Sequence, residues 1–229
     1  GSDMFFSVGT QPQLKVEGLT QPVGSQVMPP GAVQHMAYQL MTAKQRTEFE
    51  RDLEMNLAVS VGGSGRFRIN VYYQRGEVSM VARLIKNEIP PISALGLPNQ
   101  LEKLAMLDRG LILVVGAAGS GKSTTLAAML DHRNSNKDGH ILCIEDPIEF
   151  LHKHKRSVID QREVGLDTHS FGDALRNVLR EAPDVIMLGE IRDLDSMQHA
   201  LHYAETGHLC LATLHANNAN QALDRIINF

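Results

Sequence analysis

The residues with the clearest chemical meaning form one short glycine-rich segment, GAAGSGKST, near the middle of the chain. In it, Gly116 is followed after four residues by Gly121, Lys122 and Ser123, which is the spacing of a phosphate-binding loop. Glycines let the backbone curl so that successive N–H groups face one anion, and a helix that starts here adds its positive end. The segment therefore predicts a binding site for a nucleoside triphosphate. The residues expected to line it are Gly116, Ala118, Gly119, Ser120, Gly121, Lys122, Ser123 and Thr124.

Two side chains of this segment have individual roles in such a site. Lys122 can reach the β- and γ-phosphates, because it follows the last glycine of the loop. The hydroxyl group of Ser123 can ligate Mg²⁺. We therefore expect Mg²⁺ to bind together with the nucleotide.

Further polar residues stand at the ends of apolar runs. Glu190 ends the run DVIMLG, where a carboxylate can hold the water shell of Mg²⁺ or the attacking water. Glu145, Asp146 and Glu149 follow HILCI, and spacing alone does not say which of the three polarises that water. His215 comes directly after LCLATL, and its ring N–H could donate to the γ-phosphate.

These residues require a scaffold that brings the ends of the runs together. The runs LILVV, HILCI, DVIMLG and LCLATL are continuously apolar, which is typical of strands buried on both faces of a parallel sheet. Helical segments are expected between them at residues 122–131, 170–181 and 195–205. Alternation of strands and helices predicts a doubly wound α/β domain, whose ligands bind beyond the carboxyl ends of the strands.

The first 86 residues have a different pattern. MFFSV and QLKVEG are short strand candidates, and an apolar stripe at helical spacing follows at residues 33–41. LAVSV, RFRINVYY and EVSMVARLI, separated by the turns GGSG and QRGE, predict an antiparallel meander. The proline-containing stretch at residues 87–100 reads as a linker. We expect an α+β domain at 1–86, a linker at 87–100 and the α/β domain at 101–229.

Composition narrows the classes of function. The net charge is −4, only 5% of residues are aromatic and none is Trp, so nothing favours a nucleic-acid surface. No apolar run approaches the roughly 20 residues that span a bilayer. Cys143 and Cys210 lie in apolar runs, as reduced thiols in a cytosolic protein do. The basic stretch LHKHKRSV is expected to be a solvated or subunit-facing loop, in preference to a metal or nucleic-acid site.

Six segments of the chain occur together in one protein family. They are, in order, GAAGSGKST, IEDPIEF, QREVG, LREAPDVIMLGEIRD, AETGHL and TLHANNA. They resemble the Walker A motif, Asp box, atypical Walker B motif and His box of the secretion-superfamily ATPases. Within these, the chain is similar over essentially its whole length to the PilT/PilU retraction ATPases of type IV pili. The segment GHLCLATLHANNANQALDRII is closer to the PilU branch.

The resemblance implies a PAS-like N-terminal domain, a RecA-like P-loop ATPase domain and a homohexameric ring that binds ATP and Mg²⁺. Helices follow the His box in the family, so we expect those C-terminal helices to be missing after Phe229. The implied function is ATP-driven pilus retraction and twitching motility. Its place is the cytoplasm, at the periphery of the inner membrane.

The partners implied are a platform protein of the inner membrane and a paralogous retraction ATPase, with no nucleic acid expected. The alternatives are an accessory nucleotide-binding ring that works only with a partner retraction ATPase, and an extension or secretion ATPase. A DNA-translocating relative is a further alternative, against which the acidic net charge counts.

The resemblance also implies roles for single residues. Glu149 matches the catalytic glutamate of the Asp box, Glu190 the Walker B glutamate, which we also expect as a metal ligand, and His215 the His-box histidine. Arg68 and Arg83, on successive predicted strands, match the arginines that the N-terminal domain directs at the phosphates. From the residues alone, the alternatives Arg66 and Arg75 fit equally well.

Overall fold

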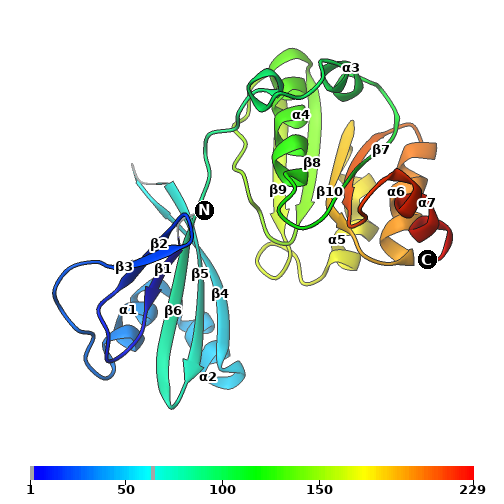
Figure 1. Cartoon of the computed structure of the whole chain (residues 1–229). Helices are drawn as coiled ribbons and strands as arrows, with labels where there is room; N and C mark the ends of the chain where they lie inside the picture. Colours follow the sequence, from blue (N-terminus) through cyan, green and yellow to red (C-terminus); the bar gives the residue numbers. More distant parts are fainter. Residues whose placement is uncertain (1–2, 63–64) are drawn as a thin grey trace. The chain divides into compact units, whose positions relative to one another are not determined.

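The computed structural model describes residues 3–62 and 65–229. These residues belong to two compact units, Gly1–Lys86 and Asn87–Phe229, which are drawn in Figure 1 and described one at a time below. The expected turn GGSG lies partly outside the described residues. The first unit holds an antiparallel sheet and the second a parallel sheet with helices, which confirms the predicted fold class.

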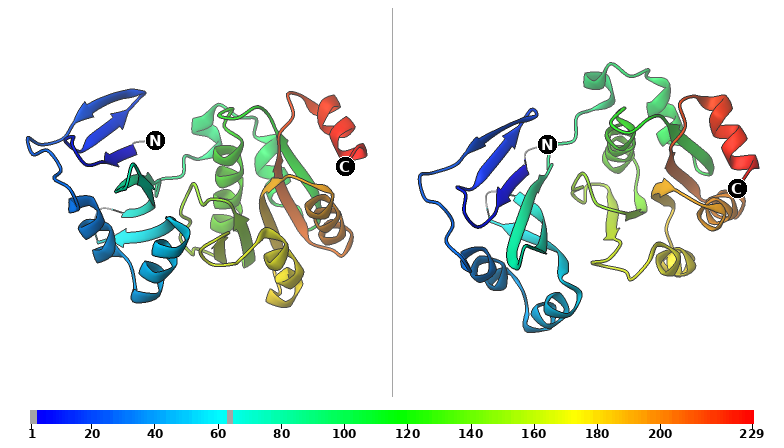
Figure 2. Two further views of the ribbon diagram at one scale, coloured as in Figure 1. Left: turned by 90° about the horizontal axis from the view of Figure 1, so that it is seen from below. Right: turned by 60° about the horizontal axis from the view of Figure 1, so that its bottom comes forward.

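The first unit is a six-stranded antiparallel sheet in the order β3-β2-β1-β6-β5-β4. Its strands are β1 (Asp3–Phe6), β2 (Gln13–Val16), β3 (Leu19–Pro22), β4 (Glu54–Val61), β5 (Gly65–Gln74) and β6 (Glu77–Ile85). Its helices are α1 (Ala32–Leu40) and α2 (Ala43–Asp52), which lie on one face of the sheet (Figures 1 and 2).

The core of this unit lies between that face and the two helices. Alternate residues of β5, Ile69 and Val71, point into it, because successive side chains of a strand face opposite ways. The predicted apolar stripe forms α1 and buries Val33 and Ala37. Phe49 of α2 is fully buried and stacks on Tyr73 with 5.1 Å between ring centroids. The first unit therefore has a core of its own.

The second unit is a five-stranded parallel sheet in the order β7-β11-β10-β8-β9. Its strands are β7 (Gly110–Val115), β8 (Gly139–Glu145), β9 (Ser157–Glu163), β10 (Val185–Ile191) and β11 (Leu209–Leu214). Its α-helices are α3 (Gln100–Ala105), α4 (Lys122–Asn136), α5 (Phe171–Asn177), α6 (Leu194–Glu205) and α7 (Ala219–Ile227). Two 3-10 helices, η1 (Ile92–Leu95) and η2 (Val178–Glu181), complete it. The sequence analysis did not foresee β9 or α7.

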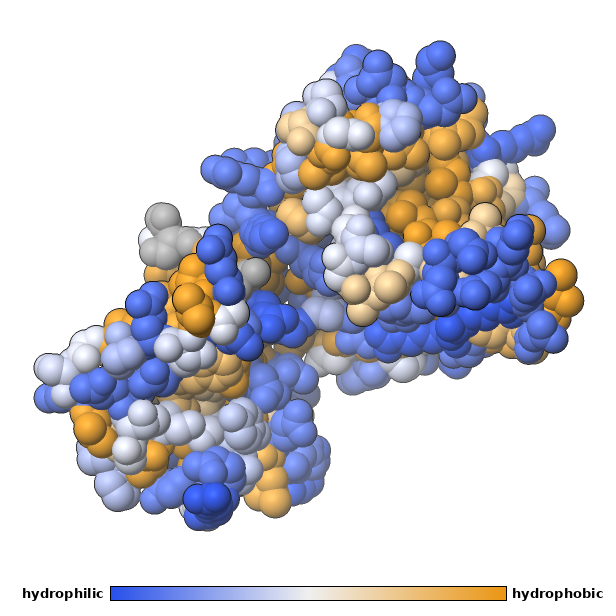
Figure 3. All heavy atoms as spheres, in the orientation of Figure 1, coloured by the Kyte–Doolittle hydropathy of each residue, from blue (hydrophilic) through white to orange (hydrophobic). Residues whose placement is uncertain are grey.

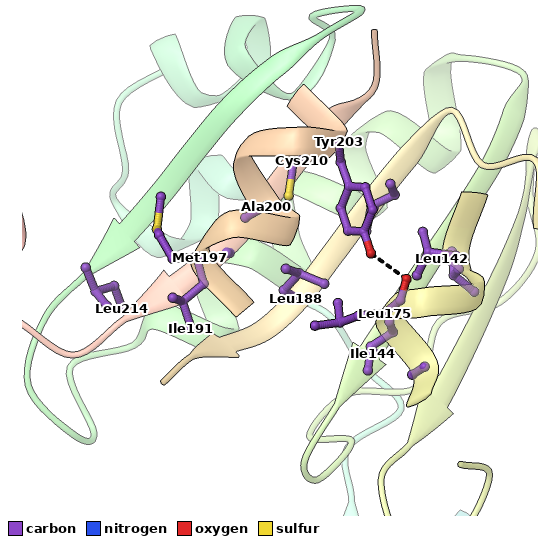
Figure 4. Close-up of a cluster of buried hydrophobic side chains, with 14 of the residues drawn as sticks. Leu142, Ile144, Leu175, Leu188, Ile191, Met197, Ala200, Tyr203, Cys210 and Leu214 are labelled. Atoms are coloured by element: carbon purple, nitrogen blue, oxygen red, sulfur yellow. Dashed lines mark hydrogen bonds between the residues drawn. The ribbon is translucent and has the colours of Figure 1, made fainter. Parts of the chain in front are cut away.

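Both faces of this sheet are covered by helices. Ile141 and Cys143 of β8 pack against α3 and α4, whereas Leu142 and Ile144 pack on the side of α5 and α6. Figure 4 shows the second of these clusters, in which the Tyr203 hydroxyl of α6 donates a hydrogen bond of 2.6 Å to the Leu175 carbonyl of α5. Burial on both faces explains why these strands are continuously apolar.

The edge strand β7 is less covered than the central strands of this sheet. β7 stands at an edge of the sheet, and its residues are half-buried from Gly110 to Val115. In the space-filling view, hydrophobic residues form a continuous area in the region where Figure 1 draws β7 (Figure 3). None of the described helices is both long and apolar enough to cross a lipid bilayer.

The segment at residues 87–100, expected as a linker, belongs to the second unit. Ile92 in η1 is buried and packs in the cluster of α4. A buried arginine of α4, Arg133, donates hydrogen bonds of 2.8 Å and 2.6 Å to the carbonyls of Ala105 and Leu107. These contacts fix the entry of the chain into this unit, because they satisfy carbonyl groups at the end of α3.

Candidate functional site

A cavity of about 380 Å³ lies in the second unit, at the carboxyl ends of its strands. This edge of a parallel sheet collects loops from several strands, so side chains distant in sequence meet there. The predicted site residues that line the cavity are Ala118, Gly119, Gly121, Lys122, Ser123, Thr124, Glu149, Glu190 and His215. The structure therefore brings together the glycine-rich segment and the polar ends of three strands.

The glycine-rich segment passes from β7 to the start of α4. Gly121 caps the helix with φ of 96°, a left-handed conformation that residues with a Cβ rarely adopt. The remaining predicted residues of this segment, Gly116 and Ser120, are absent from the cavity lining and pack against each other. The N-terminus of α4 thus opens toward the cavity, and its free N–H groups give this end a partial positive charge.

Lys122 is buried at the start of α4 and its ammonium group is held by the loop. It donates hydrogen bonds of 2.9 Å to the carbonyls of Gly116 and Ala117. Its Nζ also lies 3.5 Å from His215 Nδ1. With the ammonium as donor, Nδ1 is the acceptor, and the ring proton is then on Nε2. A buried cation inside a loop of this shape is suited to bind an anion.

A chain of polar and charged side chains continues from this lysine along the rim of the cavity, where β8, β10 and β11 end. His215 Nε2 lies 3.1 Å from Glu190 Oε1. The other oxygen of Glu190 accepts a hydrogen bond of 2.9 Å from Arg192 Nε, and Arg192 Nη1 donates one of 2.9 Å to Asp146. The tips of β8, β10 and β11 are thereby linked through side chains.

Close packing of the backbone positions Glu190. A Cβ atom at Gly189 would lie 3.2 Å from the Cα of Glu145 and 3.2 Å from the carbonyl oxygen of Ile144, so β10 approaches β8 where only glycine fits. The Thr213 hydroxyl of β11 donates to the Gly189 carbonyl at 2.5 Å. The register of β10 shifts between Leu188 and Ile191, which brings Glu190 to the rim.

The three acids that follow β8 have different surroundings. Glu145 is buried, and burial raises its pKa to about 7, against hydrogen bonds from Gln161 and from the backbone N–H of Glu149. Asp146 is paired with Arg192, and Glu149 is exposed at the cavity. The structure thus separates residues that sequence spacing could not: of the three, Glu149 is accessible and forms no ion pair with any other described residue.

The predicted arginines lie in the first unit. Arg68 of β5 is the direct cross-strand neighbour of Arg83 of β6, and Arg83 forms an ion pair with Asp3 of β1. Register places Arg66 on the same face of the sheet as these two, away from the helices. Arg75 is instead in the turn after β5, with φ of 50°. Contact of Arg68 and Arg83 with phosphate stays a prediction.

Sequence reasoning missed several residues of the cavity. Arg192 could have been found, because it directly follows an acid-bearing strand tip between two carboxylates. His152, Phe171, Met187 and Gly189 also line the cavity, and no local pattern marks them. Burial lowers the pKa of His152 to about 4, so this ring is neutral near pH 7.

The basic stretch after β8 is tied to α4 through ion pairs. Lys155 contacts Asp131 at 2.7 Å and Arg156 contacts Asp138 at 2.9 Å. Among the described residues, no three His, Cys, Asp or Glu side chains form a group that could hold a metal ion, here or elsewhere.

Known proteins share both the sequence and the fold of this chain. The chain belongs to the Type II/IV secretion system protein family, whose model matches residues 24–229. The chain is 53% identical over 229 residues to the type IV pilus ATPase PilU of Pseudomonas aeruginosa, and 43% identical over 227 residues to PilT of the same organism. The family resemblance predicted from the sequence motifs is thereby confirmed.

Solved structures agree with this membership. A crystal structure of the pilus retraction motor PilT with bound ADP matches the whole chain with a TM-score of 0.94 and 46% sequence identity. The chain covers 67% of that structure. It covers 60% of the length of PilU and 66% of PilT, so it spans about three fifths of the curated relatives that it matches.

Proposed function

We propose that the protein binds ATP with Mg²⁺ in the cavity of the second unit and hydrolyses it. The observation that carries this proposal is the buried Lys122 ammonium inside the glycine-rich loop, in a cavity that the acids of the neighbouring strand tips also line. The triphosphate would accept hydrogen bonds from this lysine and from the N–H groups at the start of α4. The ADP bound to the related PilT supports a nucleotide as ligand.

The donor groups fit a magnesium ion that arrives with the nucleotide. The Ser123 hydroxyl and the Glu190 carboxylate are hard oxygen ligands on the cavity wall. Mg²⁺ commonly takes only one or two protein ligands and completes its shell with phosphate oxygens and water, which agrees with the few ligands offered here. When bound, the ion would neutralise charge on the phosphates.

Five further side chains would then act on the triphosphate and its metal ion. Glu149 orients and polarises the attacking water, because its carboxylate is accessible at the cavity. Glu190 holds the metal shell. His215 lies at the tip of β11, where its Nε2–H, turned from Glu190 toward the nucleotide, would donate to the γ-phosphate. Arg68 and Arg83 of the first unit supply positive charge to the phosphates.

The work that hydrolysis drives is proposed from the relatives. PilT and PilU are type IV pilus ATPases, and a related protein of Neisseria gonorrhoeae is a twitching motility protein. We propose that this protein, with a PAS-like first unit and a RecA-like second unit, forms a homohexameric motor for pilus retraction. It would work in the cytoplasm against a platform protein of the inner membrane.

Hydrolysis is tested with the substitution Glu149→Gln. Turnover of Mg-ATP should fall at least about hundredfold, since the general base is lost, whereas binding of a fluorescent ATP analogue should stay within about twofold. Glu205→Gln, on the exposed end of α6, is the matched control and should turn over like wild type. Wild-type turnover in Glu149→Gln would reject the assigned base, and an inactive wild type would reject the proposed activity.

A second candidate function is an accessory ring that works with a partner retraction ATPase. This candidate is supported by the higher sequence identity to PilU than to PilT, 53% against 43%. Turnover measured with and without a PilT-type partner separates the two. Strong activity of the protein alone would count against an accessory role, and activity only in the mixture would support it.

A further inference from the structure

At the rim of the cavity, Arg192 touches acids at the tips of two different strands. It stands two residues after Glu190, at the end of β10. Its Nε donates to Glu190 Oε2 and its Nη1 to Asp146 Oδ2, both at 2.9 Å. The planar guanidinium group has several donors in a rigid fork, so it can bridge two carboxylates in a way that a lysine ammonium cannot.

This bridge determines the orientation of Glu190. One oxygen of Glu190 faces His215 and the other accepts from Arg192, so the carboxylate is held from both sides. Without the arginine, Glu190 and Asp146 would be two like charges on adjacent strands, which repel. The hydrogen bond that Arg192 donates to Glu190 raises the pKa of Arg192 further, so its guanidinium group is charged at every working pH.

The backbone of Arg192 is itself fixed. Its N–H donates to the hydroxyl group of Ser196 at 3.2 Å, and Ser196 is buried. Asp193, the next residue, caps α6 and accepts a hydrogen bond of 2.8 Å from the N–H of Ser196. Arg192 thus projects from a rigid junction between β10 and α6, which suits a residue that holds others in place.

We propose that Arg192 is a positioning residue for ATP hydrolysis: it holds Glu190 and Asp146 in the orientation in which Glu190 serves the metal-bound triphosphate. This inference rests on the proposed function and deepens it. Arg192 acts through the two acids and contacts no reacting atom. Because its side chain is 54% exposed, the ion pairs contribute little to folding stability. Its loss should therefore affect turnover and not stability.

The test compares Arg192→Gln and Arg192→Lys with wild type. We expect kcat to fall about tenfold in Arg192→Gln, with Lys restoring only part of it, because an ammonium lacks the fork. Affinity for a fluorescent ATP analogue with Mg²⁺ should stay within about twofold, and the thermal midpoint within about 2 °C. Arg176→Gln, which removes an exposed arginine paired with Asp173, is the matched control and should leave all three unchanged.

A double-mutant cycle with Asp146→Asn decides whether Arg192 acts through its acids. The double variant should be no slower than the slower single variant by more than about twofold, since both changes break the same bridge. Additive losses, full rescue by lysine, or wild-type kcat in Arg192→Gln would overturn the positioning role while leaving ATP hydrolysis intact. Absence of turnover in wild type would instead overturn the proposed function and this inference together.

Discussion

The two sheets of the chain arrange their strand ends differently. In the antiparallel sheet of the first unit, neighbouring strands end at opposite edges, and its arginines are spread over one face and one turn. In the parallel sheet of the second unit, β8, β10 and β11 all end at one edge, where Asp146, Glu190 and His215 meet. Strand direction thus decides which sheet gathers polar side chains into a cavity.

The two cores also differ in how they are covered. The first sheet has helices on one face, and the second has helices on both. A sheet covered on both faces leaves its strand ends as the place where polar groups can reach solvent and ligand. Substitutions in either core are consequently expected to change stability, whereas substitutions at the strand ends of the second unit are expected to change ligand binding.

The largest expected effect is on nucleotide binding at the rim of the cavity. Lys122→Ala should weaken binding of Mg-ATP about thousandfold, because it removes a buried cation with several charge-assisted contacts to phosphate. Titration with a fluorescent ATP analogue measures it. Lys44→Ala, on exposed α2 of the first unit, is the control and should bind as wild type does. Equal losses of affinity in both variants would contradict the assignment of nucleotide binding to the second unit.

The next effect is on the core of the first unit. Phe49→Ala should lower its free energy of unfolding by about 4 kcal/mol, since the fully buried ring leaves a cavity beside Tyr38 and Tyr73. Urea unfolding followed by tyrosine fluorescence suits this unit, because no Trp is present in the chain. Leu19→Ala, at a residue that is 77% exposed, should change the value by less than about 0.5 kcal/mol. Similar losses at the two positions would contradict the described core.

A smaller effect on stability is expected where β10 lies closest to its parallel neighbour β8. Gly189→Ala should destabilise the second unit by about 3 kcal/mol, because the new methyl group would press on backbone atoms that cannot move aside. Chemical denaturation monitored by circular dichroism gives the value. Gly62→Ala in the first unit, where a Cβ meets nothing within 4 Å, serves as the control. A tolerated Gly189→Ala would mean that the strands separate more easily than described.

The smallest effect is a pH dependence at Glu145. Its folded pKa of about 7 lies above the ordinary value of 4.5, so the folded state binds the proton more tightly and wild-type stability falls as pH rises between these values. Glu145→Gln cannot titrate. Its free energy of unfolding relative to wild type should therefore increase by on the order of 2 kcal/mol from pH 4.5 to pH 7.

The opposite pH trend of His152, whose pKa is lowered to about 4, is common to both proteins and cancels in the difference. Unfolding in urea at several pH values measures this difference. Glu205→Gln should show none, and a flat difference for Glu145→Gln would contradict the buried carboxylate.

Sequence reasoning found the parts of the site that depend on local pattern. The phosphate loop, Glu190 and His215 follow apolar runs directly, and strand ends of a parallel sheet necessarily share an edge. It could not choose among the acids after β8, because the choice depends on Gln161 in β9 and on Arg192. These contacts join residues far apart in the sequence, so the spacing of the acids along the chain does not predict them.

The fold, like the site, could be predicted only where the local sequence pattern is clear. The helix at residues 33–41 and all strands except β3 and β9 have a clear apolar pattern, and the structure contains them. α2 has a capping box between Thr42 and Gln45 but little hydrophobic character, and the signal was overlooked. β9 follows a basic loop and, with the sequence SVIDQRE, lacks a continuous apolar run, so its pairing with β8 shows only in three dimensions.

The two ends of α4 hold different parts of the second unit. It starts at the phosphate loop, and its other end fixes the backbone at Ala105 and Leu107 through Arg133 and at Lys153 through Asn134. At about 1.5 Å per residue, its 15 residues form a rod of roughly 22 Å. Because a helix is stiff along its axis, we expect the two anchored ends of α4 to move together. A small displacement at the phosphate loop would therefore reach the backbone at the end of α3 and at Lys153, so α4 couples the loop to these distant segments of the second unit.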